Sequence, residues 1–202
     1  MKKINVIISI LIIIMLLVII NGVRNFVIIS EIFKKGENFN IPSNYSIDIN
    51  SSHAMGTFEE KLKIKDNIYF LEKNYDNEQY EKITEISWYN TETKEHIVIN
   101  NEENGEFRKK ENPPQENLFI IEWFIFERLY DFKEIFICNM FNVITTEDNS
   151  YKIKTNNSGD EFVDKDTGFL SKLVSEDGTA ITNIIYKENV VNDEEVEKPE
   201  NY

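Results

Sequence analysis

The spacing of apolar and polar residues changes along the chain, and its first stretch is apolar throughout. Residues 4–20 carry no charge, and the uncharged run extends to residue 23. Twenty residues in a helix span about 30 Å, which matches the hydrocarbon core of a bilayer. Residues 1–23 are therefore predicted to form one transmembrane helix.

A cleaved signal peptide is the alternative interpretation of this stretch. Such a peptide has a shorter apolar run, followed by small residues at a cleavage site. Residues 19–24 are Ile-Ile-Asn-Gly-Val-Arg, without an Ala-x-Ala pattern and without a cysteine for lipid attachment. These residues favour an uncleaved signal anchor.

Basic residues near the run predict its orientation. Lys2 and Lys3 precede it and Arg24 follows, although Lys34 and Lys35 weaken the contrast. Because basic flanks stay in the cytoplasm, we expect a single-pass protein of the cell membrane with a cytoplasmic N-terminus. The rest of the chain is then extracytoplasmic.

Residues 25–35 predict a second helical segment. Phe26, Ile29, Ile32 and Phe33 have the spacing of one helical face, and Lys-Lys-Gly follows at 34–36 as a typical C-terminal stop. A helix on the membrane surface and a helix packed on a sheet both fit this stripe. Packing on a sheet is favoured, because it is the commoner use of a single apolar stripe.

From residue 44 the period changes to two, which predicts strands with one buried face. Tyr45, Ile47 and Ile49 alternate with polar residues, and residues 58–65 do the same. Short turns at 66–67 and 90–93 separate further apolar runs. Consecutive antiparallel pairing is the economical topology.

Residues 118–138 interrupt the strands with a helical pattern that is apolar nearly all round in its first turns. A second transmembrane span is disfavoured, because the segment carries six charged residues that are expensive in a bilayer. We expect a buried helix capped by Asn117. Its apolar positions at spacings of three and four are Leu118, Ile121, Ile125, Leu129, Phe132 and Phe136.

Strand patterns return at 151–153, 161–163, 169–174 and 181–186, with turns at 164–168 and 176–178. The predicted fold class is therefore α+β, with both helices needing the same sheet face to bury their apolar sides. We expect the domain to occupy residues 24–199, and an acidic end at 200–202 to fray.

Charge excludes one class of partner. Lys and Arg total 22 against 36 Asp and Glu, and residues 37–202 alone have a net charge of −18. A nucleic-acid binder needs a basic surface, so nucleic acid is excluded as a partner. An acidic domain is also repelled by anionic lipid headgroups, so we expect it to stand off the membrane unless a specific patch holds it.

Residues with catalytic or metal-binding chemistry are scarce. Cys138 cannot form an intramolecular disulfide, and His53 and His96 lack the spacing of a zinc site. Asp164-x-Asp166 departs from a calcium loop at its fifth, sixth and twelfth positions, so a hairpin turn is the better interpretation. The sequence predicts no enzyme, cofactor or metal. An extracytoplasmic hydrolase built on paired carboxylates is the third-ranked alternative.

Three segments resemble the LolA-like superfamily of lipoprotein carriers, including its membrane-tethered members in Gram-positive bacteria. They are Asp164-Lys165-Asp166-Thr167-Gly168-Phe169 with Lys172-Leu173, Ile184-Ile185-Tyr186-Lys187-Glu188-Asn189-Val190 with the following acidic residues and Pro199, and the turn Trp88–Lys94. The element order over residues 25–199 is also similar.

The resemblance implies a curved antiparallel sheet, a partly open barrel whose concave face is apolar and covered by helices. In that family the concave side binds acyl chains of lipoproteins or lipids. Here the helix at 118–136 would act as a lid over inward-facing strand residues. The implied strand lining is Phe58, Leu62, Ile64, Phe70, Trp88 and Ile99, facing the lid residues Leu118, Ile121, Ile125, Leu129, Phe132 and Phe136.

We therefore expect a membrane-anchored extracytoplasmic domain that holds a lipid or lipoprotein acyl chain in an apolar groove. The anchor departs from a soluble shuttle, which must leave the membrane. The alternative is a cell-envelope interaction or sensor domain with a filled core, which contacts an envelope protein through its loops or acidic tail.

Overall fold

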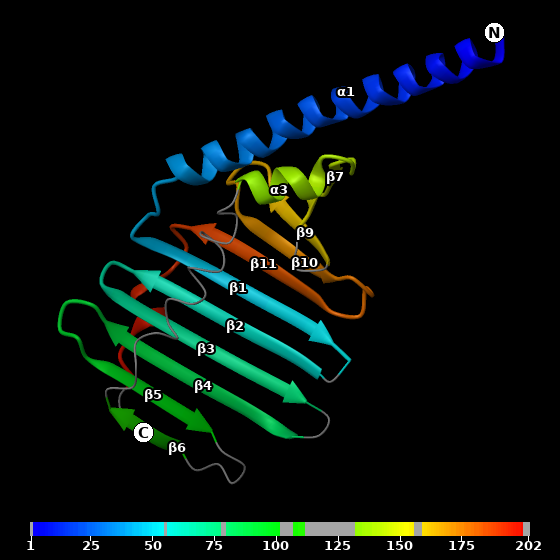
Figure 1. Cartoon of the computed structure of the whole chain (residues 1–202). Coiled ribbons are helices and arrows are strands. Elements are labelled where there is room, and N and C mark those ends of the chain that lie inside the picture. The colour runs from blue at the N-terminus through cyan, green and yellow to red at the C-terminus, as the bar shows by residue number, and fades with distance from the viewer. Residues whose placement is uncertain are drawn as a thin grey trace.

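A long helix leads into one antiparallel sheet (Figure 1). The computed structural model describes residues 2–54, 56–77, 80–101, 107–111, 132–155 and 159–199. Within these ranges the helices are α1 (Lys2–Asn38), α3 (Phe132–Asn139) and the short 3-10 helix η1 (Asp193–Val196). The strands are β1 (Asn44–His53), β2 (Gly56–Lys65), β3 (Ile68–Asn77), β4 (Tyr80–Asn90), β5 (His96–Asn101), β6 (Phe107–Glu111), β7 (Thr145–Glu147), β8 (Ser150–Lys154), β9 (Gly159–Asp164), β10 (Leu170–Ser175) and β11 (Ile181–Glu188).

Two meanders meet in the middle of the sheet. The described strands follow the order β6-β5-β4-β3-β2-β1-β11-β10-β9-β8-β7, and each neighbouring pair is antiparallel. The first meander runs outward from β1 to β6. The second runs inward from β7 to β11, which pairs with β1 over eight residue pairs. The α+β class and the consecutive antiparallel pairing predicted from the sequence are confirmed.

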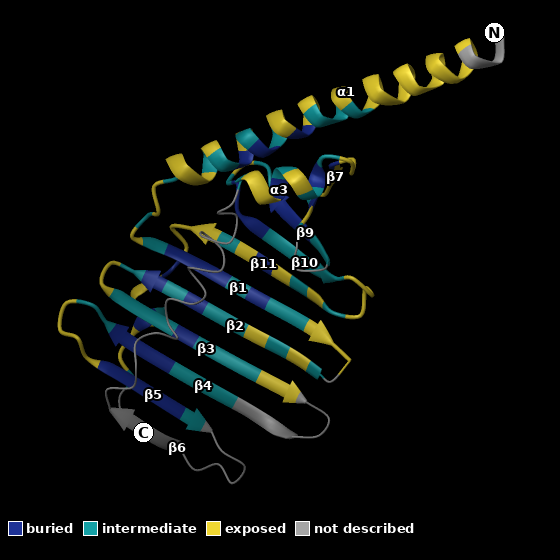
Figure 2. Cartoon of the chain, in the orientation of Figure 1, coloured by how far each residue is buried: buried dark blue, intermediate teal, exposed yellow. Residues whose placement is uncertain are grey.

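The two helical segments expected at the N-terminus form one continuous helix. α1 runs from Lys2 to Asn38 through the boundary expected at residue 23. It also continues past Gly36, so the predicted stop there is wrong. At the end of the helix the Asn38 side-chain amide donates to the Lys34 carbonyl oxygen at 2.6 Å. Residues 5–17 are exposed, and burial begins only farther along α1 (Figure 2).

The C-terminal half of α1 packs on α3 and on one face of the sheet. Ile29 and Ile32 are buried in a cluster with Ile135 of α3, Ile153 of β8 and Val163 of β9. The prediction of a helix lying on a sheet at residues 25–35 is therefore confirmed. α1 and α3 thus cover the β8–β9 end of the sheet on this face, which we call the helix face.

The helix face continues into the central strands. Tyr45, Ile47, Leu62, Leu71 and Tyr89 are almost fully buried there. Burial falls off toward the β1–β2 turn, where Ser52 and His53 of β1 and Thr57 and Glu59 of β2 are exposed (Figure 2). The core therefore lies under one half of each long hairpin.

The C-terminal segment covers the opposite face, which we call the tail face. Trp88 of β4 donates from its indole Nε1 to the Val196 carbonyl oxygen at 3.0 Å, and both residues are buried. Trp88 clusters with Ile97 and Ile99 of β5. Lys63 pairs with Glu195 at 2.8 Å, which ties η1 to β2. Residues 200–202, where fraying was expected, lie outside the described residues.

Candidate functional site

A slot opens inside the sheet where β10 and β11 diverge. The two strands pair over only three residue pairs next to their connecting turn, from Val174–Ile181 to Lys172–Asn183. Beyond this point β11 continues alongside β1 to the Tyr45–Glu188 pair. After Asn183, β11 therefore remains paired with β1 on one side, and on its other side β10 has diverged from it.

A β-bulge turns β10 away from β11. The pairing of β10 with β9 shifts register between Leu170 and Lys172, which makes Ser171 the extra residue. The Ser171 hydroxyl donates to the Phe162 carbonyl oxygen at 3.1 Å, and lies 2.9 Å from the Ser150 hydroxyl of β8. These contacts hold the bulge to the outer strands. A bulge bends its strand and ends regular pairing, which is how the slot arises here.

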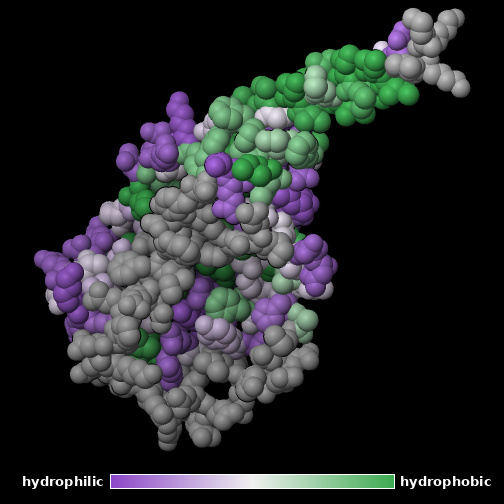
Figure 3. All heavy atoms as spheres, in the orientation of Figure 1, coloured by the Kyte–Doolittle hydropathy of each residue, from purple (hydrophilic) through white to green (hydrophobic). Residues whose placement is uncertain are grey.

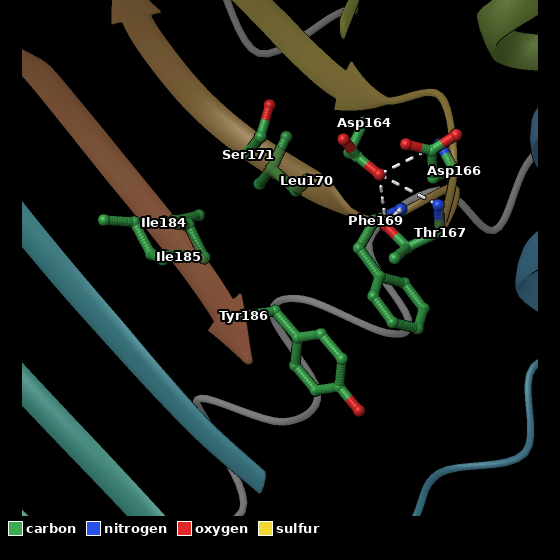
Figure 4. Close-up of a pocket in the computed structure, with 9 residues that line it drawn as sticks. All are labelled: Asp164, Asp166, Thr167, Phe169, Leu170, Ser171, Ile184, Ile185 and Tyr186. Atoms are coloured by element: carbon green, nitrogen blue, oxygen red, sulfur yellow. Dashed lines mark hydrogen bonds between the residues drawn. The ribbon is translucent and has the colours of Figure 1, made fainter. Parts of the chain in front are cut away.

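The slot contains a pocket of about 340 Å³ that is partly open to solvent (Figure 4). This volume lies at the lower end of the range of about 300–1,000 Å³ that is typical of small-molecule sites. Ile184 and Ile185 point to opposite sides of β11 in Figure 4, so the pocket contacts residues from both faces of the sheet. Its lining residues are Asp164, Asp166, Thr167, Phe169, Leu170, Ser171, Ile184, Ile185 and Tyr186.

Aromatic rings close one end of the pocket. The Phe169 and Tyr186 rings lie edge to face with centroids 5.5 Å apart. Phe39, just after α1, packs edge-on against Phe169 at 4.5 Å and against Tyr186 at 5.8 Å. Burial raises the pKa of the Tyr186 hydroxyl, and the nearby Glu188 carboxylate raises it further, so the phenol stays neutral over the physiological range. The three rings form the wall at this end, with the Glu188 carboxylate next to the Tyr186 hydroxyl.

A polar turn forms the rim of the pocket next to Phe169 (Figure 4). The Asp164 carboxylate accepts from the backbone N–H groups of Asp166 and Thr167 at 3.0 and 2.9 Å, and from the Thr167 hydroxyl at 2.9 Å. The hairpin turn predicted at 164–168 is confirmed. Across the described ranges, no group of three or more His, Cys, Asp or Glu side chains is arranged to hold a metal ion. The rim therefore offers hydrogen-bonding groups next to an apolar interior.

This rim rests on the end of α1. Gly168 has a φ of 78°, and a Cβ at this position would lie 2.9 Å from the Ile32 carbonyl oxygen and 3.2 Å from the Gly36 nitrogen. Only glycine allows both this conformation and this approach. The Lys35 ammonium also donates to the Lys165 carbonyl oxygen. The position of the pocket rim is therefore set by the same helix that begins as the apolar N-terminal run.

The strand residues predicted to line one groove do not share a face. Register pairs Leu62 with Leu71 and Lys63 with Phe70, which puts Leu62 and Phe70 on opposite faces. Three residues lie on the helix face, namely Phe58, Leu62 and Ile64, and three lie on the tail face, namely Phe70, Trp88 and Ile99. The expectation of one common lining is therefore wrong, and a single groove can contain only one of these sets.

The predicted lid is described only in its last part. Phe132 and Phe136 lie on α3 and contact the rings of Phe26 and Phe33 of α1, with centroids 5.4–5.8 Å apart. They pack on α1 and not on any of the six predicted strand residues in the described contacts. Leu118, Ile121, Ile125 and Leu129 lie outside the described residues.

Sequence reasoning missed the residues that line the pocket. Phe169, Leu170, Ile184 and Tyr186 fall in ordinary strand patterns, and nothing in alternation shows that β10 leaves β11. The segments 164–169 and 184–190 were, however, the ones that carried the family resemblance. That likeness was the available signal. No protein-family model matches the chain, and no curated protein matches it either.

Proposed function

We propose that this protein is a membrane-anchored, extracytoplasmic binding module that holds the acyl chain of a lipid or lipoprotein in the slot between β10 and β11. The observation that carries the proposal is a pocket with an apolar, aromatic interior and a hydrogen-bonding rim. Burying a methylene gains about 0.8 kcal/mol, so even part of an acyl chain would be retained. The role is binding and not catalysis.

The proposal includes the finer architecture implied by the resemblance. The sheet would curve as a partly open barrel, with its helix face concave and α1 and α3 on that side. The ligand would enter from the edge created by the bulge at Ser171. Rim groups such as Thr167 would remain in water and contact the polar end of the ligand.

Contacts of α1 support the anchored form over a cleaved one. Among the described residues, α1 is the helix long and apolar enough to cross a bilayer. The amides of Asn21 and Asn25 and the Arg24 guanidinium donate to backbone oxygens between Asn139 and Ile144. Cleavage near residue 21 would remove part of this packed helix. Lys2 and Lys3 favour a cytoplasmic N-terminus, which would place the domain outside.

Photo-crosslinking in a bilayer tests the proposal. The full chain in phosphatidylcholine nanodiscs would be irradiated with a palmitate that carries a diazirine, and labelled peptides would be mapped by mass spectrometry. We expect label on residues 164–171 and 184–186, besides label on α1 from the surrounding lipid. Label on α1 alone would contradict the proposal.

Two substitutions on β11 provide a matched comparison. Ile185→Glu places a carboxylate in the lining, and burying it beside an acyl chain is costly, so we expect label at 164–171 to fall at least about tenfold. Ile181→Glu changes a residue of similar exposure on the same strand and face, outside the pocket. It should keep the label, and equal losses in both variants would argue against a specific site.

An envelope interaction or sensor domain with a filled core is the second candidate. Leu62, Ile64 and Leu71 are at most 2% exposed and pack together, so the region expected to be a groove on the helix face is filled at these residues. In vivo crosslinking through the exposed Glu194 and Glu197 should then recover one envelope protein, and charge reversal at both should abolish it. The acyl-chain proposal predicts no such dependence.

A further inference from the structure

The loop between α3 and β7 exposes large apolar side chains. Phe141 is 75% exposed, Val143 62% and Ile137, on the last turn of α3, 55%. Single exposed apolar residues are common, but three within seven positions form a patch that needs a partner. We call Ile137, Phe141 and Val143 the loop patch.

Hydrogen bonds hold the loop patch beside the end of the apolar run. The Asn21 amide donates to the Asn142 carbonyl oxygen at 2.9 Å, and the Arg24 guanidinium donates to the Ile144 carbonyl oxygen at 2.8 Å. The buried Asn25 amide donates to the Asn142 carbonyl oxygen at 2.7 Å. The loop is therefore fixed to α1 at residues 21–25.

α3 directs this loop toward the N-terminal, apolar half of α1. Its first residue, Phe132, contacts Phe33, and its last residue, Asn139, accepts from the Asn25 amide at 2.6 Å. The next contact, from Asn21, is one turn closer to the N-terminus. α3 therefore runs antiparallel to α1, and the loop projects from the domain on the side of the apolar run.

The apolar run fixes the level of the bilayer. Twenty uncharged residues from Ile4 to Val23 span about 30 Å, so the hydrocarbon core would end near Val23. The interfacial layer beyond it is about 5–7 Å thick, which corresponds to the next four residues of α1. Val23, Phe26 and Val27 are 49–60% exposed at this level. Figure 3 shows the hydrophobic surface of α1 continuing onto atoms beneath its middle part, where it meets the domain.

We propose that the loop patch inserts into the interface of the same bilayer that α1 spans, so that the domain is docked on the membrane. The proposal rests on the anchoring part of the proposed function. We propose lipid as the partner of the loop patch because α1, which spans the bilayer, already holds the loop at the membrane surface. The contact is apolar, since a net charge of −18 beyond residue 36 opposes electrostatic attraction to anionic lipid.

Docking would fix the height of the pocket above the membrane. The rim residue Gly168 rests on Ile32, nine residues beyond Val23, which corresponds to about 13 Å along the helix. A docked domain would therefore present the pocket just above the headgroups, within reach of a chain leaving the bilayer. A swinging domain would not hold this distance.

Spin-label depth measurements on the full chain in phosphatidylcholine liposomes test the docking. Single cysteines would replace Phe141, Val143, Leu17 and Ile181 in a Cys138→Ala background, and each nitroxide would be probed with oxygen, which concentrates in lipid, and with a water-soluble nickel chelate. We expect position 17 to lie deep, positions 141 and 143 to shift toward oxygen accessibility, and position 181, which lies outside the pocket, to remain aqueous.

The outcomes separate the two proposals. If position 17 is deep while 141 and 143 match 181, docking is overturned and the anchor stands. An aqueous position 17 overturns both. Low accessibility to both reagents at 141 and 143 would mean that protein covers the loop patch, which also overturns docking. The two loop positions serve as replicates in case one substitution perturbs the fold.

Discussion

The two ends of the sheet are covered on opposite faces and by different means. At the β8–β9 end, the helix face is covered by α1 and α3, with Ile29 and Val163 fully buried. At the β4–β5 end, the tail face is covered by the C-terminal segment, with Val196 and Trp88 in contact. The first cover is a pair of helices connected to the apolar run, and the second is a short segment containing η1, held by one indole and a few ion pairs.

The two covers therefore have different roles: the helices position the pocket rim, and the C-terminal segment covers the core. The helix end connects the apolar N-terminal run to the pocket rim, so changes there should alter both. The tail end completes the core around Trp88. Its described hydrogen bonds and ion pairs include those to Asn44 of β1, Lys63 of β2 and Trp88 of β4, and none of them reaches the pocket rim. Damage at one end should therefore leave the other end protected.

The largest expected effect is at the tail end. Trp88→Ala removes a buried indole and its hydrogen bond to Val196, and should lower the free energy of unfolding by about 3–5 kcal/mol. Urea denaturation would measure the loss, and hydrogen exchange should increase in β4, β5 and residues 191–199. Trp88→Phe keeps most of the packing and should lose only about 1–2 kcal/mol. Equal exchange increases in α3 and β8 would contradict the separation of the two ends.

The matching change at the helix end is Ile29→Ala. It leaves a cavity between α1, α3 and the sheet, and should cost about 2–5 kcal/mol. Exchange should rise in α3, β8 and the turn at 164–168 and stay low around Trp88. Val27→Ala, on the same helix and 58% exposed, should change stability by less than about 0.5 kcal/mol when measured in detergent.

A glycine pair isolates the contact between α1 and the pocket rim. Gly168 and Gly178 both have positive φ, so replacing either with alanine costs about 1–2 kcal/mol in backbone strain. Only Gly168→Ala also brings a Cβ against backbone atoms of α1. Its cost should exceed that of Gly178→Ala by about 1–3 kcal/mol, and acyl labelling at 164–171 should fall in this variant alone. Equal costs in thermal denaturation would mean that the rim does not depend on α1.

The smallest effect is the pH dependence of the tail cover. The hydrogen bond and ion pair with Lys63 lower the pKa of the Glu195 carboxyl below its usual 4.5, and a bond from the Asn192 N–H adds to this. A lowered pKa in the folded state contributes stability that is present above about pH 4.5 and is lost as pH falls through the lowered value. Trp88 emission in a Trp123→Phe protein should therefore change at acid pH, and Glu195→Gln should flatten the change. If the pH dependence of Trp88 emission is the same in Glu195→Gln, the Lys63–Glu195 pair does not stabilise the C-terminal segment on the sheet.

Local patterns predicted most of the secondary structure. Alternation at 45–49 and 58–64 identified β1 and β2, and the turns at 66–67, 90–93 and 164–168 lie where polar runs placed them. The prediction of one groove lining was wrong because some of these strands carry apolar residues on both faces. Trp88 and Tyr89 are adjacent, and so are Ile97, Val98 and Ile99, and all five are buried. A continuous apolar run does not reveal which side faces which cover.

The sequence alone determined the apolar run, the strands and their turns, because these depend on neighbours a few residues apart. Tertiary structure decided that α1 continues unbroken to Asn38, that β11 pairs with β1, and that the tail covers Trp88. It also created the slot through the bulge at Ser171, and it placed the rim on α1, where Gly168 approaches residues more than 130 positions away. Such contacts depend on how separate elements pack, and the periodic pattern of apolar and polar residues does not predict them.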